Sequence, residues 1–355
     1  MPQFGVGILP SGAVGAELAA LTRRAFVPRL VVQIYKATPV LGLLMRNAQK
    51  AKGGASQITV PVQGGSYTQF SWSDYSGVFP QPAVLTAAQN AEFNLKLGVV
   101  PIPFMGMESL VQSSEVVVPI LKARMADAKT VAVQAISGAL FTNNYNVPGQ
   151  TQVDSLYQAY DDGTNVTTYG GINRTSNTFW KSTVKTSVGS ATNTRTGTIK
   201  YIVNTTSLAG GEAPDFMVMA PGDWTTLMTD YMVTGLTAGT GSGGGGVSAM
   251  EQYQTGPRSR YGIDDVVNSG FRAILLGDTP IFMDPFCPQG TAYIFNSRYL
   301  AMYISEDAPF AFSGFYSSIP NLQIANIGVV IVAFDVVCSK PSSGMKLTGI
   351  TGNAF

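Results

Sequence analysis

The chain of 355 residues contains no histidine and only two cysteines, and these absences exclude several kinds of site. Nucleophilic sites of the Ser-His-Asp and Cys-His types need an imidazole as base, and many zinc sites need it as a ligand. Cys287 and Cys338 are too few for a four-thiolate metal site and too far apart for a Cys-x-x-Cys redox motif. We therefore expect both to be small buried apolar residues. We predict no enzymatic activity, and no catalytic, cofactor-binding or metal site.

The chain also has few charges and no long hydrophobic run. Charged residues make up 12% of it, against about 25% in an average soluble domain. A membrane could explain this, but a spanning helix needs about 20 consecutive apolar residues. The longest run, from Ile327 to Phe334, is stopped by Asp335. The first residues lack the basic start and apolar segment of a signal peptide. We therefore expect that other protein covers much of the surface, as in an obligate assembly.

The charges that are present are unevenly distributed, although the net charge is only +1. Residues 1–52 carry a local balance of +6, and no basic residue lies between Lys200 and Arg258. A basic arm and an acidic lobe on one chain favour contact between copies or an arm that faces a polyanion. Unrelated solvated faces remain the alternative. The arm residues that we single out as contact candidates are Arg23, Arg24 and Arg29.

The first third of the chain changes its hydrophobic period. Residues 13–50 have helical patterning in three pieces, because Pro28 and Pro39 interrupt it. From Lys52 to Pro103 the period is two, which predicts two strands. The first contains Ile58, Val60 and Val62, with Pro61 placing it at a sheet edge. The second alternates through Ala91, Phe93, Leu95, Leu97 and Val99. The segment between them carries the aromatic residues Phe70, Trp72, Tyr75 and Phe79.

A long helix is predicted within residues 113–141, where apolar residues recur at helical spacing. Proline is tolerated only in the first turn of a helix, so we expect the regular part to start near Pro119. From there to Phe141 it would span about 34 Å at about 1.5 Å per residue.

The rest of the chain mixes strands, turns and a helix. Residues 213–232 predict a strand, a turn and a helix capped by Asp223. Residues 270–304 predict three strands, separated by turns. The last run, residues 322–337, is apolar at both odd and even positions, and this predicts a strand that is buried on both faces.

This order of segments closely resembles that of major capsid proteins of tailed bacteriophages, which have the Hong Kong 97 fold of the α+β class. The resemblance rests on a basic jointed arm, a two-stranded loop that follows Lys52 and two glycines, and an alanine-rich helix that ends in GALF. It also rests on YGGINR with the downstream Trp180, and on QGTAYIFNSRYLAMYI. It covers nearly the whole chain as architecture, while each motif alone is loose.

The resemblance implies a domain organisation. Residues 1–52 would form the N-terminal arm, and residues 53–103 the extended two-stranded E-loop. Residues 104–160, with the spine helix, and the return strands 290–355 would form the P-domain. The A-domain would take residues 161–289.

The stretch from Tyr160 to Trp180 offers two adjacent carboxylates, Asp161 and Asp162, but no site that fits them. The spacing of an EF-hand calcium loop is missing, and carboxylates of a glycoside hydrolase face each other across about 5 to 9 Å, whereas sequence neighbours usually diverge. Asp-Gly and the glycine pair favour turns. We interpret the stretch as a joint between the spine lobe and the axial lobe.

The function that the resemblance implies is a virion one. The chain would be made in the host cytoplasm and would self-assemble, as hexamers and pentamers, into the icosahedral head around double-stranded DNA. Its other partners would be a portal and a separate scaffolding protein, with no membrane. Two alternatives stay open: the shell of a cellular nanocompartment, similar to encapsulins, and an extracellular β-rich adhesin or polysaccharide enzyme.

Three expectations follow. The arm begins within the first 20 residues, so we expect Met1 to be retained in the mature subunit. We expect the replacement of Arg23, Arg24 and Arg29 by Gln, all three together, to impair assembly or DNA retention. We expect the hairpin aromatics to lie across the spine helix of a neighbouring copy, so that Ser at Phe70 and Trp72 gives folded subunits that fail to form closed shells.

Overall fold

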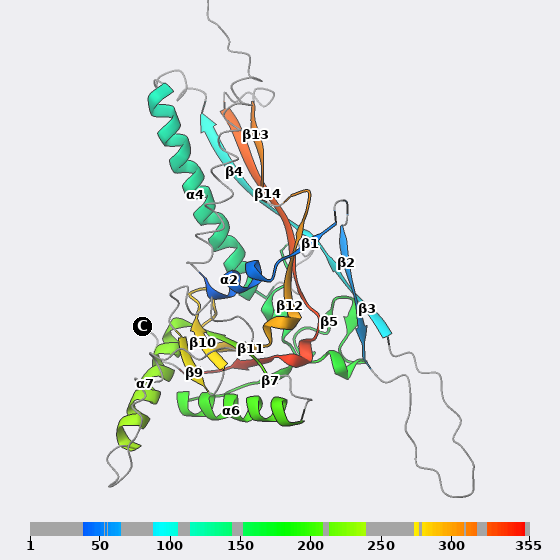
Figure 1. Cartoon of the computed structure of the whole chain (residues 1–355), viewed down its shortest axis with the longest axis vertical. Coiled ribbons are helices and arrows are strands. Elements are labelled where there is room, and N and C mark those ends of the chain that lie inside the picture. Colours follow the sequence, from blue (N-terminus) through cyan, green and yellow to red (C-terminus); the bar gives the residue numbers. More distant parts are fainter. Residues whose placement is uncertain are drawn as a thin grey trace, which may run out of the picture.

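The chain's structure is a computed structural model. It describes residues 38–52, 54, 56–64, 88–105, 114–143, 152–208, 213–238, 273–276, 279–308, 310–317 and 325–351. Figure 1 shows two sheets, one above the other, with a two-stranded ribbon to one side and a long helix beside the upper sheet.

The upper sheet is organised by one long strand, β14 (Ala325–Cys338). Strand β4 (Lys96–Met105) pairs antiparallel with it along one edge. Along the other edge lie β13 (Ala311–Ser317) and then β12 (Leu300–Ser305), both antiparallel. The short strand β1 (Gln49–Ala51) adds in parallel to β12. The predicted last strand is thus confirmed. Burial on both faces holds only for its end, from Phe334 to Cys338.

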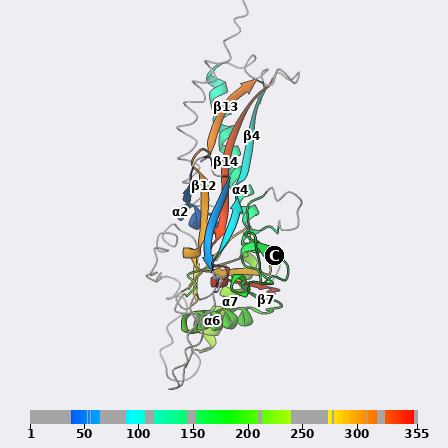
Figure 2. The same ribbon diagram turned by 90° about the vertical axis from the view of Figure 1, so that its right-hand side faces the viewer.

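Helix α4 (Ser114–Phe141) covers one face of the upper sheet (Figures 1 and 2). The predicted long helix is confirmed, but the expectation that it starts near Pro119 is wrong. The helix begins at Ser114 and runs through the proline, which cannot donate the hydrogen bond that the Glu115 carbonyl would otherwise accept. At about 1.5 Å per residue it is about 42 Å long.

The lower sheet has six strands in the order β7-β15-β11-β8-β10-β9. Its two central strands, β11 and β8, are apolar and buried apart from Thr291 at the start of β11, and helices α6 (Ala191–Leu208) and α7 (Pro221–Ala238) lie on its lower side (Figure 1). The strands are β7 (Thr183–Lys185), β8 (Phe216–Met219), β9 (Ala273–Leu276), β10 (Thr279–Met283), β11 (Thr291–Phe295) and β15 (Met345–Thr348).

Two sequence expectations about this region need correction. Asp223 does not cap α7 from outside, because Pro221 occupies its first position and Asp223 lies within the first turn. Its Oδ2 instead accepts the Gly290 N–H at 2.6 Å. Residues 270–304 hold four strands, since the 3₁₀ turn η2 (Ser297–Tyr299) separates β11 in the lower sheet from β12 in the upper one.

The ribbon pairs β2 (Gln57–Gln63) with β3 (Ala88–Asn94), antiparallel. With two strands, both are edges, so the edge position of Pro61 is confirmed. The second predicted strand is in fact two strands in different sheets, because β3 ends before Leu95 and β4 begins after it.

Helix α2 (Pro39–Arg46) confirms the last of the three helical pieces, although that piece was expected to continue to residue 50 and ends instead before β1. The connection between α4 and the lower sheet contains the remaining short elements. They are α5 (Leu156–Ala159), β5 (Thr168–Tyr169), β6 (Ile172–Asn173) and η1 (Thr178–Trp180), with η4 (Pro341–Ser343) before β15. Cys287 and Cys338 are buried and unpaired with each other, as expected.

Candidate functional site

The contact residues chosen from the sequence lie outside the residues that the structure describes, and they stay predictions. These are Arg23, Arg24, Arg29, Phe70, Trp72, Tyr75 and Phe79. The domain limits inferred from the resemblance also stay predictions. The structure describes the base of the ribbon and the two sheets, and the site is built from those parts.

The face of the upper sheet opposite α4 is apolar, and no described helix or strand covers it. Cross-strand pairs place their side chains on the same face of a sheet, and the register pairs Val99 with Ile331, Pro101 with Val329, and Pro103 with Ile327. On the other edge of β14, Tyr316 pairs with the same Ile327. We call this surface the outer apolar face. Its residues are Leu97, Val99, Pro101, Pro103, Tyr316, Ile327, Val329 and Ile331.

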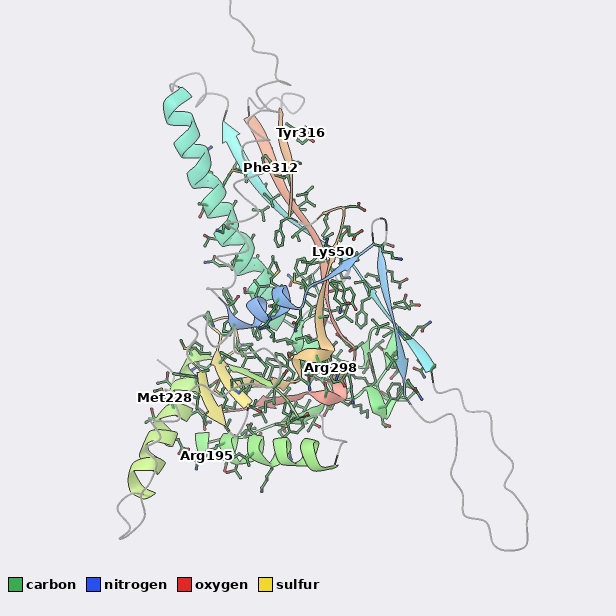
Figure 3. The ribbon with its side chains drawn as sticks, in the orientation of Figure 1. Lys50, Arg195, Met228, Arg298, Phe312 and Tyr316 are labelled. Carbon is green, nitrogen blue, oxygen red and sulfur yellow. The ribbon has the colours of Figure 1, made fainter. Side chains whose placement is uncertain are left out.

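Exposure distinguishes the two faces of the same strand. Leu97 is 61% exposed and Val99 50%, and Tyr316, near the top of the sheet in Figure 3, is 64% exposed. Ile102, at the opposite parity of β4, is buried in one core with Met125 of α4. Among α4 side chains from residue 124 to 141, Val131 is the exposed large apolar one. Among the described side chains, the exposed large apolar ones of this region are therefore more numerous on the sheet than on α4.

The sequence pattern did not reveal this face. Period-two alternation through residues 91–99 predicted one buried side, and Ala91 and Phe93 are indeed buried. Leu97 and Val99 continue the alternation but point to solvent, because the chain leaves the ribbon at Leu95 and enters a sheet whose other face is the one covered by α4.

The base of the ribbon is docked on its own subunit. The rings of Phe93 and Tyr169 meet edge to face with centroids 5.1 Å apart, and the Glu92 N–H donates to the Gly170 carbonyl at 2.9 Å. Gly170 has a φ of +56°, and a Cβ there would lie 2.6 Å from Cζ of Phe93. The base of the ribbon is therefore part of the subunit's own core.

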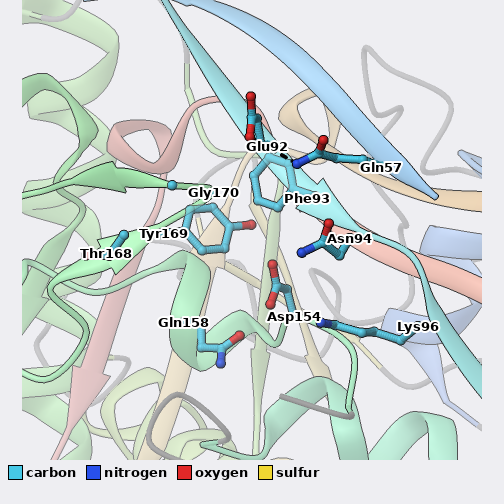
Figure 4. Close-up of a pocket in the computed structure, with 11 residues that line it drawn as sticks. Gln57, Glu92, Phe93, Asn94, Lys96, Asp154, Gln158, Thr168, Tyr169 and Gly170 are labelled. Atoms are coloured by element: carbon cyan, nitrogen blue, oxygen red, sulfur yellow. Dashed lines mark hydrogen bonds between the residues drawn. The ribbon is translucent and has the colours of Figure 1, made fainter. Parts of the chain in front are cut away.

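A cavity of about 500 Å³ opens beside this contact (Figure 4). Its walls come from both ribbon strands, the start of β4, the residues before and in α5, and the β5–β6 turn. The Gln57 side-chain amide donates to Glu92 Oε2 at 3.0 Å across the ribbon. The charged residues in the lining are Glu92, Lys96 and Asp154.

Asp154 belongs to a pair of carboxyl groups with Asp335 of β14. The Asp154 N–H donates to Asp335 Oδ1 at 3.0 Å, and the Val336 N–H donates to the same oxygen at 2.9 Å. Asp335 Oδ2 is buried and has no hydrogen-bond partner within the described part of the chain. Burial raises the pKa of Asp154 to about 6, with Lys96 opposing. Burial and the charge of Asp154 raise the pKa of Asp335 to about 8.

The stretch from Tyr160 to Trp180, which we call the joint, runs from α5 to β7, and Asp161 at its start is fully buried. Its interpretation as the connection between a spine lobe and an axial lobe stays a prediction. Asp161 Oδ1 accepts the N–H groups of Gly163, Asn165 and Val166, and Oδ2 accepts from Lys346 Nζ of β15 at 2.9 Å. Burial alone would raise the pKa of Asp161, but the hydrogen bond and charge of Lys346, with the backbone donors, hold it below its usual value.

Arg174 fixes the inside of the same joint. Its guanidinium is fully buried and donates to three backbone carbonyls, those of Trp180, Val166 and Ala159. The carbon at its centre also lies 5.1 Å from the centroid of the Tyr169 ring. The charged groups of the joint are thus engaged with the chain itself, and they act as structural ties. The sequence drew attention to Asp161 but missed its partner Lys346, which is far away along the chain.

The described residues contain no group of three or more His, Cys, Asp or Glu side chains arranged to hold a metal ion. No helix among them combines the length and apolar character that crossing a membrane requires.

No model of a known protein family matches the chain, and no curated protein matches it in sequence. Solved structures do match. A chain of the cyanophage A-1(L) capsid asymmetric unit aligns with a TM-score of 0.64 and 16% identity, covering 89% of this chain and 93% of that one.

Two further solved structures align with a TM-score of 0.50. One is of Mycobacterium phage Adephagia, at 13% identity, with 90% of this chain and 92% of that one covered. The other is the holo-SrpI encapsulin complex from Synechococcus elongatus, at 10% identity, with 94% and 92% covered. At these identities the similarity shows the fold. The α+β architecture predicted from the sequence is confirmed, and it is the Hong Kong 97-like capsid fold.

Proposed function

We propose that this chain is the major capsid protein of a tailed phage and that it self-assembles into the icosahedral head that encloses double-stranded DNA. The fold supports this, since the neighbours with a TM-score of 0.50 or more include a cyanophage capsid chain. The single observation that carries the proposal is the outer apolar face. A subunit with that fold leaves large apolar side chains uncovered on one sheet, and contiguous exposed apolar surface marks interaction sites.

A second copy of this chain is the occupant that we propose for the outer apolar face. The ribbon ends at Gln63 and Ala88 on the side of the subunit away from the upper sheet (Figure 1). The residues between these two ends carry Phe70, Trp72, Tyr75 and Phe79. Aromatic residues are enriched at the centres of protein interfaces. We propose the outer apolar face of a neighbour as their docking surface, in place of the neighbour's α4 that the sequence analysis assigned, because Leu97, Val99 and Tyr316 are exposed there, against Val131 among the described α4 side chains.

The proposed role is structural. The buried charged groups of the joint tie the chain to itself, and we assign no enzymatic activity. We propose a virion location, synthesis in the host cytoplasm, non-specific contact with packaged DNA through the basic arm, and a portal and a scaffolding protein as further partners.

The test is the assembly state of the full-length chain. The proposal expects closed shells in electron micrographs of particles purified from an infected or expressing host, and nuclease-protected double-stranded DNA in particles from an infection. A nanocompartment, the second candidate because the encapsulin complex aligns as well as the mycobacteriophage structure, would contain enzyme instead of DNA. A protein that remains at subunit size under all conditions would contradict both.

A pair of variants tests the interface itself. Leu97→Ser with Val99→Ser should leave the thermal unfolding of the isolated subunit nearly unchanged, because both side chains are already largely exposed, and should abolish or weaken shell formation. Val131→Ser on α4 is the matched control, since Val131 is 47% exposed and lies away from the outer apolar face. Equal assembly of the double variant and the wild type would exclude this face as an interface.

A further inference from the structure

The ribbon joins the upper sheet through a short pivot. Leu95 is the residue between β3 and β4, and its N–H donates to the Ser56 carbonyl at 3.0 Å, which ties the two chain segments at the base of the ribbon. Lys96 is the first residue of β4 and pairs with Phe334 of β14. A change of the ribbon's angle relative to the sheet would therefore act first on Lys96 and its surroundings.

Two carboxyl groups lie at this pivot. Asp335 follows the cross-strand partner of Lys96, and its Oδ1 is held by two backbone N–H groups, while its Oδ2 is buried and accepts no hydrogen bond from any described residue. Asp154 supplies one of those N–H groups, and its own side chain lies beside Lys96 in the cavity (Figure 4). A buried carboxylate oxygen without a partner disfavours the ionised form. A proton on the pair removes that cost.

We propose that Asp154, Asp335 and Lys96 form a proton-operated latch, which holds the base of the ribbon closed while the carboxyl pair carries a proton and loosens it when both carboxyls are ionised.

The direction of the effect follows from proton binding. In the closed state the pKa of Asp154 is raised to about 6 and that of Asp335 to about 8, whereas a solvated Asp has a pKa of about 4. The closed state therefore binds more protons than the open one between those limits. Closure is favoured in full below about pH 4 and is lost progressively as the pH rises to about 8.

The other titratable groups around the pair do not reverse this direction. Burial raises the pKa of Tyr169 far above its ordinary value and that of Cys338 to about 11, so both stay neutral over this range. Glu92 faces the cavity from β3 and accepts a hydrogen bond from Gln57. Lys96 is the cation of the cavity lining, and its charge favours the ionised carboxyls in the closed state. It therefore reduces the rise in the carboxyl pKa values and with it the extent to which the ribbon loosens at high pH.

Hydrogen–deuterium exchange on the full-length subunit tests the latch. Protection factors of peptides that cover 57–63 and 88–94, corrected for intrinsic exchange, are measured from pH 5 to pH 9. We expect a fall of at least about tenfold in the wild type, because one unit of pKa shift released on opening already gives that factor and the two carboxyls together are shifted by more than one unit. The Glu92 amide, which is bonded to Gly170 outside the ribbon, is the sharpest reporter.

Asp335→Asn should flatten this dependence, because the amide keeps an oxygen for the two N–H groups and carries no charge at any pH. Asp162→Asn is the matched control, since Asp162 accepts the Thr164 N–H in the joint and does not line the cavity. It should keep the wild-type profile.

Lys96→Met provides a second reading that does not depend on the folding of the Asp335 variant. Loss of the cation should raise the pKa of both carboxyls further and steepen the fall in protection. The latch is excluded by flat wild-type protection, by an unchanged slope in Asp335→Asn, or by an unchanged or shallower slope in Lys96→Met. Because the readout is the isolated subunit, the outcome is independent of whether the chain forms shells.

Discussion

The two sheets of the subunit differ in how they are covered. In the lower sheet, side chains of β8 alternate between two cores: Phe216 and Val218 pack on the side of the upper sheet, and Met217 and Met219 pack with Trp224 of α7. In the upper sheet, α4 covers one face, and the other face is the outer apolar face. Within the described residues, the lower sheet is covered on both faces, whereas the upper sheet is covered on one.

This difference accounts for a composition that is unusual for a monomer. Globular domains bury both faces of a mixed sheet or expose a polar face to water. The upper sheet does neither, so its apolar side chains add to the hydropathy of the chain without adding to the core of the subunit. The proposed assembly would cover this face with a second copy and would thereby account for the low charge content. Substitutions matched between the two sheets should separate subunit stability from assembly.

The largest effect is expected in the lower sheet. Phe295→Ala removes a ring that is fully buried and stacked between Tyr160 and Phe216, with centroids at 5.7 Å and 5.2 Å. We expect a loss of about 3–5 kcal/mol in the free energy of unfolding, measured by urea denaturation with circular dichroism. Tyr316→Ala is the matched aromatic change in the upper sheet and should stay within about 0.5 kcal/mol. Similar losses for both would refute the contrast between the sheets.

The next effect concerns the ion pair that fastens the joint to the lower sheet. Lys346→Met keeps the length of the side chain but leaves the buried Asp161 without its cation, and we expect a loss of about 3 kcal/mol near pH 7. The pKa of Asp161 is lowered in the folded state, so its contribution is present above about pH 4 and is lost as the pH falls further. The variant and the wild type should therefore converge in acid.

Lys185→Met, at an exposed position of β7 in the same sheet, is the control for the loss of a lysine and should have little effect. Urea unfolding at pH 3, 5 and 7 gives the comparison. A difference between Lys346→Met and the wild type that persists unchanged at pH 3 would contradict the assignment.

A smaller effect is expected where the ribbon meets the joint. Gly170→Ala places a Cβ 2.6 Å from Cζ of Phe93, at a φ of +56°. Gly171→Ala has a similar φ of +75° but meets nothing within 4 Å. We expect a loss of about 1 kcal/mol for Gly171→Ala from backbone strain, and about 2–3 kcal/mol for Gly170→Ala, which must also displace the ring. Thermal unfolding measures both, and equal losses would mean that the Phe93 contact contributes nothing.

The sequence was sufficient where one local pattern decided the structure. The long helix and the ribbon follow from hydrophobic period, and the last strand follows from its continuous apolar run, although only its end is buried on both faces. It was insufficient where a chain segment changes partners. The alternation of apolar residues continues through Leu95, but the set of alternate positions that is buried changes there. The residues before Leu95 pair with β2, whereas those after it pair with β14. Nor does anything near Asp161 point to Lys346, since the ion pair depends on the fold that brings β15 to the joint.

The smallest effect on the isolated subunit is expected for Val99→Ala, and its comparison with Ile102→Ala is the most informative one because both positions lie on one strand. Val99 and Ile102 both belong to β4, but Val99 is 50% exposed on the outer apolar face and Ile102 is 2% exposed in the core beneath α4. Ile102→Ala should cost the isolated subunit about 2–5 kcal/mol, while Val99→Ala should change its free energy of unfolding by no more than about 0.5 kcal/mol. In assembled particles, by contrast, Val99→Ala should have a measurable effect. Val99→Ala would then remove contacts with a neighbouring copy, repeated at every subunit of a shell, so the particles should disassemble at a lower urea concentration than wild-type particles, even though the subunit is as stable. Light scattering of particles and circular dichroism of subunits, measured in the same urea series, separate the two quantities.

If Val99→Ala instead destabilised the isolated subunit as much as Ile102→Ala, the outer apolar face would already be covered within one chain, and the upper sheet would be as complete as the lower one.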